Sequence, residues 1–188
     1  MNFIYSNDIS LPDFYAKTSG KLTFTSLLSD GRHFLFLKEH LVRFVRGVAH
    51  FENYSEKEKE LCEEACKDFL FKNFRPHHYF RLMYAAGTFY FTYLEHHPKP
   101  IGVRLLYSKR DRRLSSASFI KDGNYKISLE EIAKAQELGF DDVLFGNEEK
   151  VFEASTSNIL LVKDQKIIFS SLSENVFDGI LIKKITTA

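Results

Sequence analysis

The chain has 188 residues, 44% of them hydrophobic and 27% charged, a composition typical of soluble globular proteins. Its 26 basic and 25 acidic residues leave a formal net charge of +1, so general nucleic-acid binding through a broad positive field is not expected. No apolar run approaches the roughly 20 residues of a membrane-spanning helix, and the first residues lack a secretory signal pattern. One domain or two small domains fit this length.

The first predicted elements form a hairpin followed by a helix. A β-rich run at 22–28 is followed by an Asp30-Gly31 turn and a second apolar run at 33–37, a pattern typical of a hairpin. A helix is predicted from about 38 to 51, because apolar residues recur there every three or four positions.

A second helix begins near Ser55. Ser55 and Glu58 have the spacing of a capping box, in which each side chain accepts a hydrogen bond from a backbone N–H. The only cysteines, Cys62 and Cys66, share one apolar face of this helix. We expect two buried, reduced thiols and a cytoplasmic location, because no further ligands at metal-site spacing accompany them.

The centre of the chain reads as strands followed by a polar connection. The runs at 79–86 and 88–94 predict a second hairpin around Gly87, and 101–108 predicts another strand. The polar, basic segment at 109–118 has neither strand nor helix periodicity, so we interpret it as a connection between two domains.

The last third begins with a helix and ends in short strands. Ser128 and Glu131 have capping-box spacing, and Gly139 is a helix stop. Strands are predicted at 141–145 and 151–155, and 158–170 predicts a hairpin with its turn at 163–166. Strands interleaved with helices predict an α/β or α+β architecture.

Four residues have side chains or positions suited to chemistry. Lys121 lies between an apolar pair and an Asp-Gly turn, where desolvation can make a lysine a nucleophilic amine. Glu153 ends an apolar strand and could hold a protonated ring nitrogen. Arg43 could clamp a phosphate, and Gly179 opens an apolar segment whose backbone N–H groups suit an anion. Lys121 and Glu153 also have plain structural explanations, a surface lysine near a turn and a strand-end carboxylate. Arg43 on a helix face and Gly179 are weak signals when each is taken alone.

Taken together and in order, these motifs resemble the class IV aminotransferases. They are H-x-x-R at His40 and Arg43, K-x-x-N-Y at Lys121, Asn124 and Tyr125, E-x-S-x-x-N-I at Glu153, Ser155, Asn158 and Ile159, and G-I at Gly179 and Ile180. The family comprises fold-type IV pyridoxal-phosphate enzymes, among them branched-chain aminotransferase, D-amino acid aminotransferase and 4-amino-4-deoxychorismate lyase. The resemblance extends from about residue 20 to 180.

The resemblance implies a role for each motif. Lys121 would form the Schiff base with pyridoxal 5'-phosphate and move the proton, and Glu153 would pair with the pyridinium nitrogen. Arg43 would bind the cofactor phosphate with the backbone N–H groups of Gly179 and Ile180. Tyr125 would hydrogen-bond the cofactor's phenolic oxygen, and Asn158 belongs to the same implied cofactor-binding set.

The resemblance also implies an architecture and an activity. A small N-terminal α/β domain would span 1–113, a linker 114–120, and an incomplete large pseudobarrel domain 121–188. The active site would lie between the domains of a homodimer. The implied function is that of an aminotransferase or an aminodeoxychorismate-lyase-like enzyme. Its substrate would be a small molecule, an amino acid or an amino-chorismate, with no metal, nucleic acid or membrane as a partner.

Two departures from the family pattern keep an alternative open. Leu181 and Ile182 follow Gly179-Ile180 where the family commonly has Thr and Arg, so a hydroxyl and a charge are missing. The chain also ends where the family continues. The alternative is a catalytically inactive or truncated relative that acts as a structural or partner-binding module. A third hypothesis is a nucleic-acid-binding protein that uses the basic run at 109–113.

Overall fold

The computed structural model describes seven segments of the chain and divides it into two compact units. The described residues are 1–5, 11–18, 21–97, 102–110, 120–122, 125–170 and 176–186. The first unit comprises Met1–Pro98 with Phe119–Asn124, and the second comprises Lys99–Ser118 with Tyr125–Ala188. The predicted division at 1–113, 114–120 and 121–188 follows different boundaries: in the structure, Lys121 lies in the first unit.

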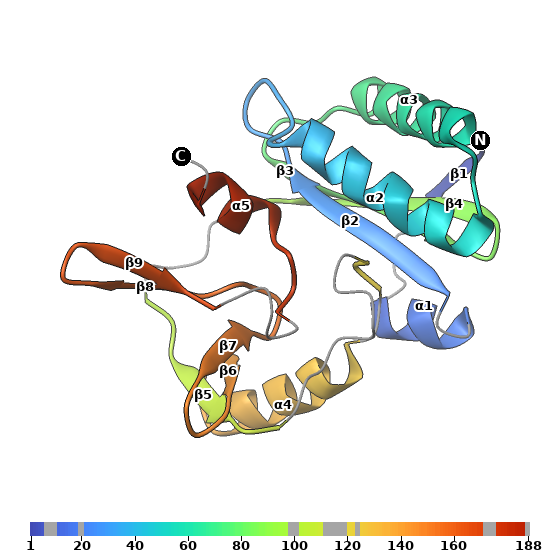
Figure 1. The fold of residues 1–188 in the computed structure, drawn as a ribbon. Coiled ribbons are helices and arrows are strands. Elements are labelled where there is room, and N and C mark those ends of the chain that lie inside the picture. Colours follow the sequence, from blue (N-terminus) through green and yellow to red (C-terminus); the bar gives the residue numbers. More distant parts are fainter. Residues whose placement is uncertain are drawn as a thin grey trace. The chain divides into compact units, whose positions relative to one another are not determined.

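The first unit is built on a four-stranded sheet (Figure 1). Its order is β1 (Phe3–Tyr5), β4 (Thr88–Glu95), β3 (His78–Ala85) and β2 (Leu22–Leu28). The hairpin predicted around Gly87 is confirmed, with β3 and β4 antiparallel and Gly87 at a φ of 80°. β2 is an edge strand, because it pairs only with β3 among the strands of this sheet.

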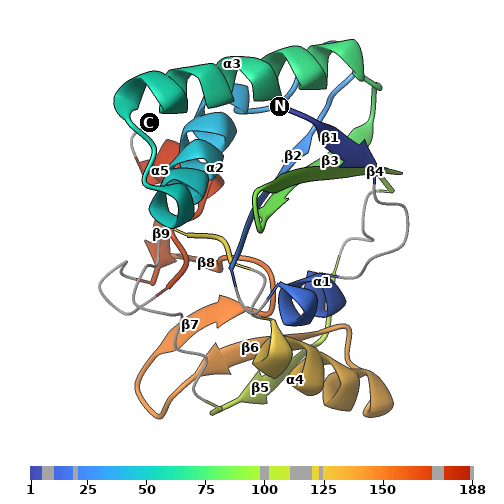
Figure 2. The ribbon, with the colours of Figure 1, turned by 90° about the vertical axis from the view of Figure 1, so that its right-hand side faces the viewer.

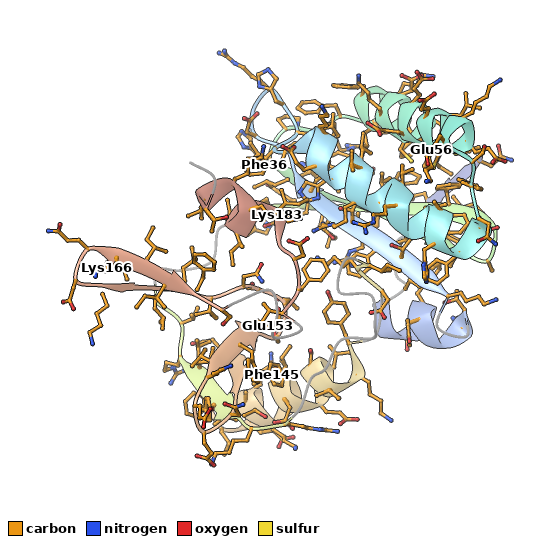
Figure 3. The ribbon with its side chains drawn as sticks, viewed as in Figure 1. Phe36, Glu56, Phe145, Glu153, Lys166 and Lys183 are labelled. Carbon is orange, nitrogen blue, oxygen red and sulfur yellow. The ribbon has the colours of Figure 1, made fainter. Side chains whose placement is uncertain are left out.

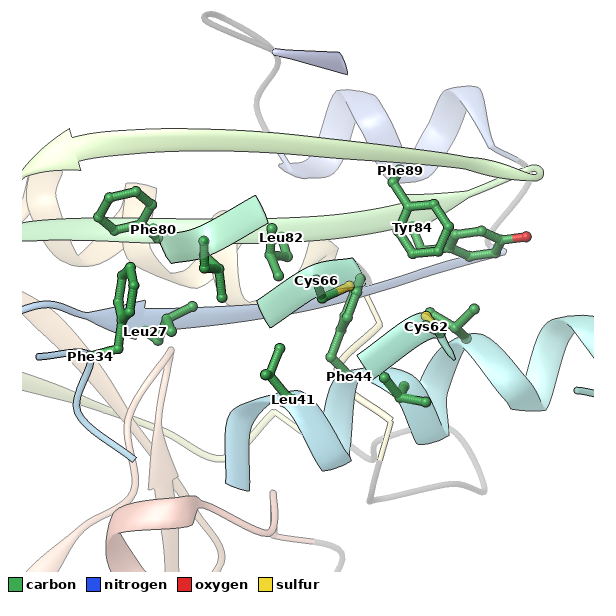
Figure 4. Close-up of a cluster of buried hydrophobic side chains, with 13 residues drawn as sticks. Leu27, Phe34, Leu41, Phe44, Cys62, Cys66, Phe80, Leu82, Tyr84 and Phe89 are labelled. Atoms are coloured by element: carbon green, nitrogen blue, oxygen red, sulfur yellow. The ribbon is translucent and has the colours of Figure 1, made fainter. Parts of the chain in front are cut away.

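Helices α2 (Leu37–Glu52) and α3 (Glu56–Lys72) cover one face of this sheet (Figure 2). Between them and the sheet lies a cluster of buried aromatic and aliphatic side chains (Figure 4). The thiols of Cys62 and Cys66 are fully buried in this cluster and form no disulfide, as predicted. The capping box at Ser55 and Glu58 is also confirmed.

The opposite face of the same sheet carries a smaller apolar layer. Phe24, Met83 and Tyr90 are register partners across β2, β3 and β4, and Phe24 and Met83 are buried. Helix α1 (Leu11–Lys17) adds Phe14, whose ring packs edge-on against Tyr90 at a centroid distance of 4.6 Å. Consecutive residues of β2 therefore face different layers, since side chains alternate along a strand.

The strand predicted at 33–37 is wrong. Only an isolated bridge joins Ser29 to Phe34, and α2 begins at Leu37. The Asp30 carboxylate accepts hydrogen bonds from the backbone N–H groups of Arg32 (2.7 Å) and His33 (2.6 Å), which forms a local turn. Phe34 then enters the aromatic core, and β2 pairs with β3 instead.

Among its described residues, the second unit has two small sheets and two helices. Strands β5 (Leu105–Ser108), β6 (Asp142–Gly146) and β7 (Val151–Ala154) form one sheet, and β8 (Leu160–Lys163) and β9 (Lys166–Phe169) form the predicted hairpin. The helices are α4 (Lys126–Glu137) and α5 (Ile180–Thr186). Within the described segments of both units, no helix has the length and apolar character needed to cross a membrane.

The capping box predicted at Ser128 and Glu131 is wrong, although the helix exists. α4 begins two residues earlier, with Tyr125 as its N-cap, so Ser128 is a buried residue inside the helix. The Glu131 carboxylate instead accepts a hydrogen bond from Ser108 Oγ at 2.7 Å and forms an ion pair with Lys134 at 2.7 Å. The carboxylate is used to attach α4 to β5.

Two further expectations for the second unit have different outcomes. Gly139, at a φ of 80°, follows the end of α4 and confirms the predicted helix stop. The connection predicted at 109–118 lies outside the described residues from 111 onward. Its first two residues form ion pairs within the unit, Lys109 with Glu148 and Arg110 with Glu130.

Candidate functional site

A buried polar group lies beneath α2 on the core-facing side of β2. The Thr25 side chain is fully buried, and its Oγ1 lies 2.8 Å from His40 Nδ1. Arg43 Nη2 donates to Thr25 Oγ1 at 3.1 Å and lies 3.4 Å from His40 Nδ1. His40 and Arg43 are one turn apart on α2, so both side chains reach the same strand residue. The H-x-x-R motif and Thr25 therefore form one hydrogen-bonded group.

His40 is held neutral in this group. Burial lowers its pKa to about 3, and the positive charges of Arg43 and Lys121 add to that effect, while Glu39 opposes it. Two donors, the Arg43 guanidinium and the Thr25 hydroxyl, approach Nδ1, so this nitrogen accepts and the ring proton lies on Nε2. The positive charge of the group consequently resides on Arg43 and not on the imidazole.

Lys121 is attached to the free edge of β2. The backbone N–H of Phe24 donates to the Lys121 carbonyl at 2.9 Å, and Lys121 Nζ lies 4.8 Å from the centre of the Phe24 ring. The ring face attracts the ammonium group. The edge of β2 thus holds the lysine backbone and side chain at one place, and the positive charge of Lys121 acts on His40.

In the second unit, Glu153 is a buried carboxylate on β7 (Figure 3). Only 5% of the residue is exposed, and its Oε2 accepts a hydrogen bond from the backbone N–H of Phe177 at 3.1 Å. Asn158 forms an isolated bridge with Glu153, and its Nδ2 donates to the Phe177 carbonyl at 2.9 Å. Glu153 and Asn158 therefore bind the backbone N–H and the backbone carbonyl of the same residue, Phe177.

These hydrogen bonds to Phe177 fix the chain two residues before Gly179, which directly precedes α5. A β-carbon on Gly179 would overlap Asn158 Oδ1, so the chain passes the amide at a distance that only glycine permits. Ile180, the first residue of α5, is buried. Beside them, Asp178 forms an ion pair with Lys183.

The structure gathers the predicted site residues into two groups, one in each unit. Arg43 and Lys121 belong to the first unit, and Glu153, Asn158, Gly179 and Ile180 belong to the second. Tyr125 is the N-cap of α4 and accepts the Leu129 N–H through its carbonyl at 2.8 Å. Asn124 lies outside the described residues.

The sequence did not predict three residues that contact the motif residues: Thr25, Phe24 and Phe177. A signal existed for Thr25, because a threonine in the apolar run at 22–28 is a hydroxyl placed in a predicted core strand. Phe177 contributes only backbone groups, which no residue-type argument detects.

Each group, taken by itself, carries residue types that suit part of a phosphorylated, nitrogen-containing ring. A guanidinium and a lysine amine beside a neutral imidazole suit a phosphate and an aldehyde. A buried carboxylate, already fixed by a backbone N–H, suits a protonated ring nitrogen. The residues present therefore fit pyridoxal phosphate.

Comparison with known proteins gives one family. The model of the amino-transferase class IV family matches residues 22–188. No curated protein sequence matches the chain.

Solved structures share the fold at low sequence identity. A candidate 4-amino-4-deoxychorismate lyase from Legionella pneumophila aligns with a TM-score of 0.76 and 17% identity, over 100% of this chain and 76% of that one. The branched-chain amino acid aminotransferase from Escherichia coli aligns with a TM-score of 0.71 and 17% identity, over 92% of this chain and 65% of that one. A fold IV-transaminase from Curtobacterium pusillum aligns with a TM-score of 0.67 and 17% identity, over 92% of this chain and 67% of that one. The mixed α/β fold is therefore the fold-type IV aminotransferase fold.

Proposed function

The chain belongs to the class IV aminotransferase family, and from this membership we propose that it is a pyridoxal-phosphate-dependent aminotransferase or an aminodeoxychorismate-lyase-like enzyme. Its substrate class is an amino acid or an amino-chorismate. The observation that carries the proposal is the position of Lys121, whose amine lies over Phe24 at the edge of β2 in the unit that also holds Arg43.

Each residue has a defined task in this proposal. Lys121 would hold the cofactor through its amine and, once the substrate amine has replaced it there, would carry the proton removed from the substrate. Arg43 and the backbone N–H groups of Gly179 and Ile180 bind the phosphate. Glu153 holds the proton on the ring nitrogen through a charge-assisted hydrogen bond.

The remaining tasks are positional. Tyr125 donates a hydrogen bond to the cofactor's phenolic oxygen, and Asn158 holds the segment that presents Gly179. Pyridoxal phosphate, when bound, supplies an electron sink for the bond that breaks at the substrate carbon. The same residues serve transamination and lyase chemistry, which differ in the bond finally resolved.

The test is a covalent adduct on a single lysine. Wild-type protein is incubated with pyridoxal phosphate, reduced with borohydride, and digested for mass spectrometry. We expect a visible absorbance band that reduction abolishes, and an adduct on the peptide containing Lys121. Lys121→Ala should lose both signals, whereas Lys126→Ala, at an exposed position of α4, should retain them. Identical spectra for wild type and Lys121→Ala would overturn the proposal.

One observation favours the second candidate, a catalytically inactive relative. Asp178 directly precedes Gly179 and Ile180 in the chain, and its carboxylate forms an ion pair with Lys183. A negative charge at this place opposes the binding of a phosphate. Thermal unfolding with increasing pyridoxal phosphate separates the candidates, because a ligand that binds only the folded state raises the melting temperature. A constant melting temperature would favour the inactive relative.

The proposal also includes an oligomeric state and a cellular location. A homodimer is implied by the resemblance, and the β8–β9 hairpin, whose eight residues are all exposed, offers apolar surface for it. Sedimentation at several concentrations tests this, and a monomer throughout would contradict it. The buried, reduced thiols of Cys62 and Cys66 support a cytoplasmic location.

A further inference from the structure

The Arg43 side chain is tied to the sheet through one hydroxyl. Thr25 Oγ1 accepts from Arg43 Nη2 at 3.1 Å, and the same hydroxyl lies 2.8 Å from His40 Nδ1. With His40 neutral and Nδ1 accepting, the hydroxyl proton is directed to the imidazole. The lone pairs of Thr25 Oγ1 are then left for the guanidinium. The bonds run in one direction, from Arg43 to Thr25 to His40.

This arrangement fixes a side chain that is otherwise flexible. Arginine loses rotamer freedom when it is held in one geometry, and its recognition of phosphate depends on the orientation of a planar fork. Thr25 lies on β2 with no exposed surface, and β2 is fixed by its register with β3. The rigid sheet therefore sets where the guanidinium plane lies.

His40 supplies what the hydroxyl needs. A protonated imidazole that donated to Thr25 would occupy one of the two lone pairs on its hydroxyl oxygen and would compete with Arg43 for an acceptor site. Burial of His40 is the main factor that opposes its protonation, and the positive charges of Arg43 and Lys121 add to it, while Glu39 acts in the other direction. The imidazole is thereby kept as an acceptor.

We infer that Thr25 and His40 are positioning residues that orient the Arg43 guanidinium toward the phosphate of a phosphorylated ligand. This inference rests on the proposed function, in which Arg43 binds the cofactor phosphate. Neither residue touches the ligand in this role. Their effect is specific for the phosphate and is absent for the same ring without it.

The test compares pyridoxal phosphate with pyridoxal. Dissociation constants for both compounds are measured by absorbance for wild type, Thr25→Val and Thr25→Ser. Thr25→Val keeps the shape but removes the hydroxyl, and we expect pyridoxal phosphate affinity to fall about tenfold while pyridoxal affinity is unchanged. Thr25→Ser should restore most of the loss. Thr23→Val, a buried residue two positions away on the same strand, should leave both affinities as in wild type.

A second pair of variants covers the case in which Thr25→Val does not fold. Asparagine at position 40 can place an amide oxygen near the position of Nδ1, and leucine cannot accept a hydrogen bond. His40→Leu should therefore weaken only pyridoxal phosphate, and His40→Asn should weaken neither compound.

The outcomes separate the inference from the proposed function. Equal losses for both compounds, no loss for either, or no recovery in Thr25→Ser would overturn the positioning role while wild-type binding still supports the enzyme. Failure of wild type to form an adduct with either compound would instead overturn the proposed function.

Discussion

Asn158 Oδ1 occupies the space in which a side chain on Gly179 would lie. The two residues are 21 positions apart, and the Asn158 amide also donates to the Phe177 carbonyl at 2.9 Å. The segment before α5 therefore passes against an amide that is itself fixed. Gly179 is required here for space, and its backbone is not in the left-handed region.

Gly179→Ala should destabilise the protein by about 1–3 kcal/mol, the usual range for overpacking a tight site. The cost should be much smaller in an Asn158→Ala background, where the obstructing amide is absent. Urea unfolding of the two single variants and the double variant measures this coupling. Gly31→Ala is the control, because a β-carbon there meets only the His77 ring at ordinary contact distances of 3.6 and 3.7 Å. Simple additivity would show that Asn158 is not the obstruction.

The two serine–glutamate pairs show how far local sequence predicts structure. Both pairs have capping-box spacing, yet only Ser55 begins a helix. The second serine is overridden because Glu131 bonds to Ser108 on a neighbouring strand. A local pattern predicts local hydrogen bonds and fails where a distant strand competes for the same carboxylate.

The candidate site divides in the same way. The motifs single out Arg43, Lys121 and Glu153 as candidate site residues, because the resemblance depends on residue order alone. The attachment of Arg43 to Thr25 requires α2 to pack on β2, and that of Glu153 to Phe177 joins residues 24 positions apart. Neither contact follows from spacing, since both arise from tertiary packing.

The two serines also give a matched stability prediction. Ser55→Ala removes a confirmed cap and should cost about 0.5–2 kcal/mol. Ser128→Ala removes a buried hydroxyl that has no hydrogen-bond partner among the described residues, so stability should stay constant or rise. Denaturant midpoints at constant slope measure both effects. A similar loss in the two variants would contradict the assignment of Tyr125 as the N-cap of α4.

A third prediction concerns the run at 33–37. Phe34 is 7% exposed and makes edge-on contacts with the Phe80 and Phe74 rings at centroid distances of 5.0 and 5.1 Å. Phe34→Ala should cost about 3–5 kcal/mol, as for other buried aromatic residues. Leu35→Ala, at a residue 37% exposed, should cost far less. If 33–37 were a strand with Leu35 facing the core and Phe34 facing solvent, the larger loss of stability would occur at Leu35. The same unfolding measurements therefore distinguish that strand from the observed turn.

The last prediction concerns acid stability and His40. In the folded protein its pKa is lowered to about 3 by burial and by the charges of Arg43 and Lys121, whereas an unfolded histidine titrates near 6.5. Between these values the unfolded state binds the additional proton, so the free energy of unfolding falls as the pH is lowered. The slope due to this one site is at most about 1.4 kcal/mol per pH unit.

The measurement is the difference between wild type and His40→Asn across pH 7 to 4. Carboxylates such as Glu58 and Glu131 also have lowered pKa values, so their protonation in acid destabilises both proteins. This contribution is the same in wild type and variant and cancels in the difference. We expect wild type to lose stability more steeply than the variant below pH 6.5. His50→Asn, the same substitution at an exposed position of α2, should follow the wild-type curve. Parallel curves for wild type and His40→Asn would mean that the imidazole gains a proton in the folded state as readily as in the unfolded one, and the hydroxyl of Thr25 would then have no acceptor at position 40.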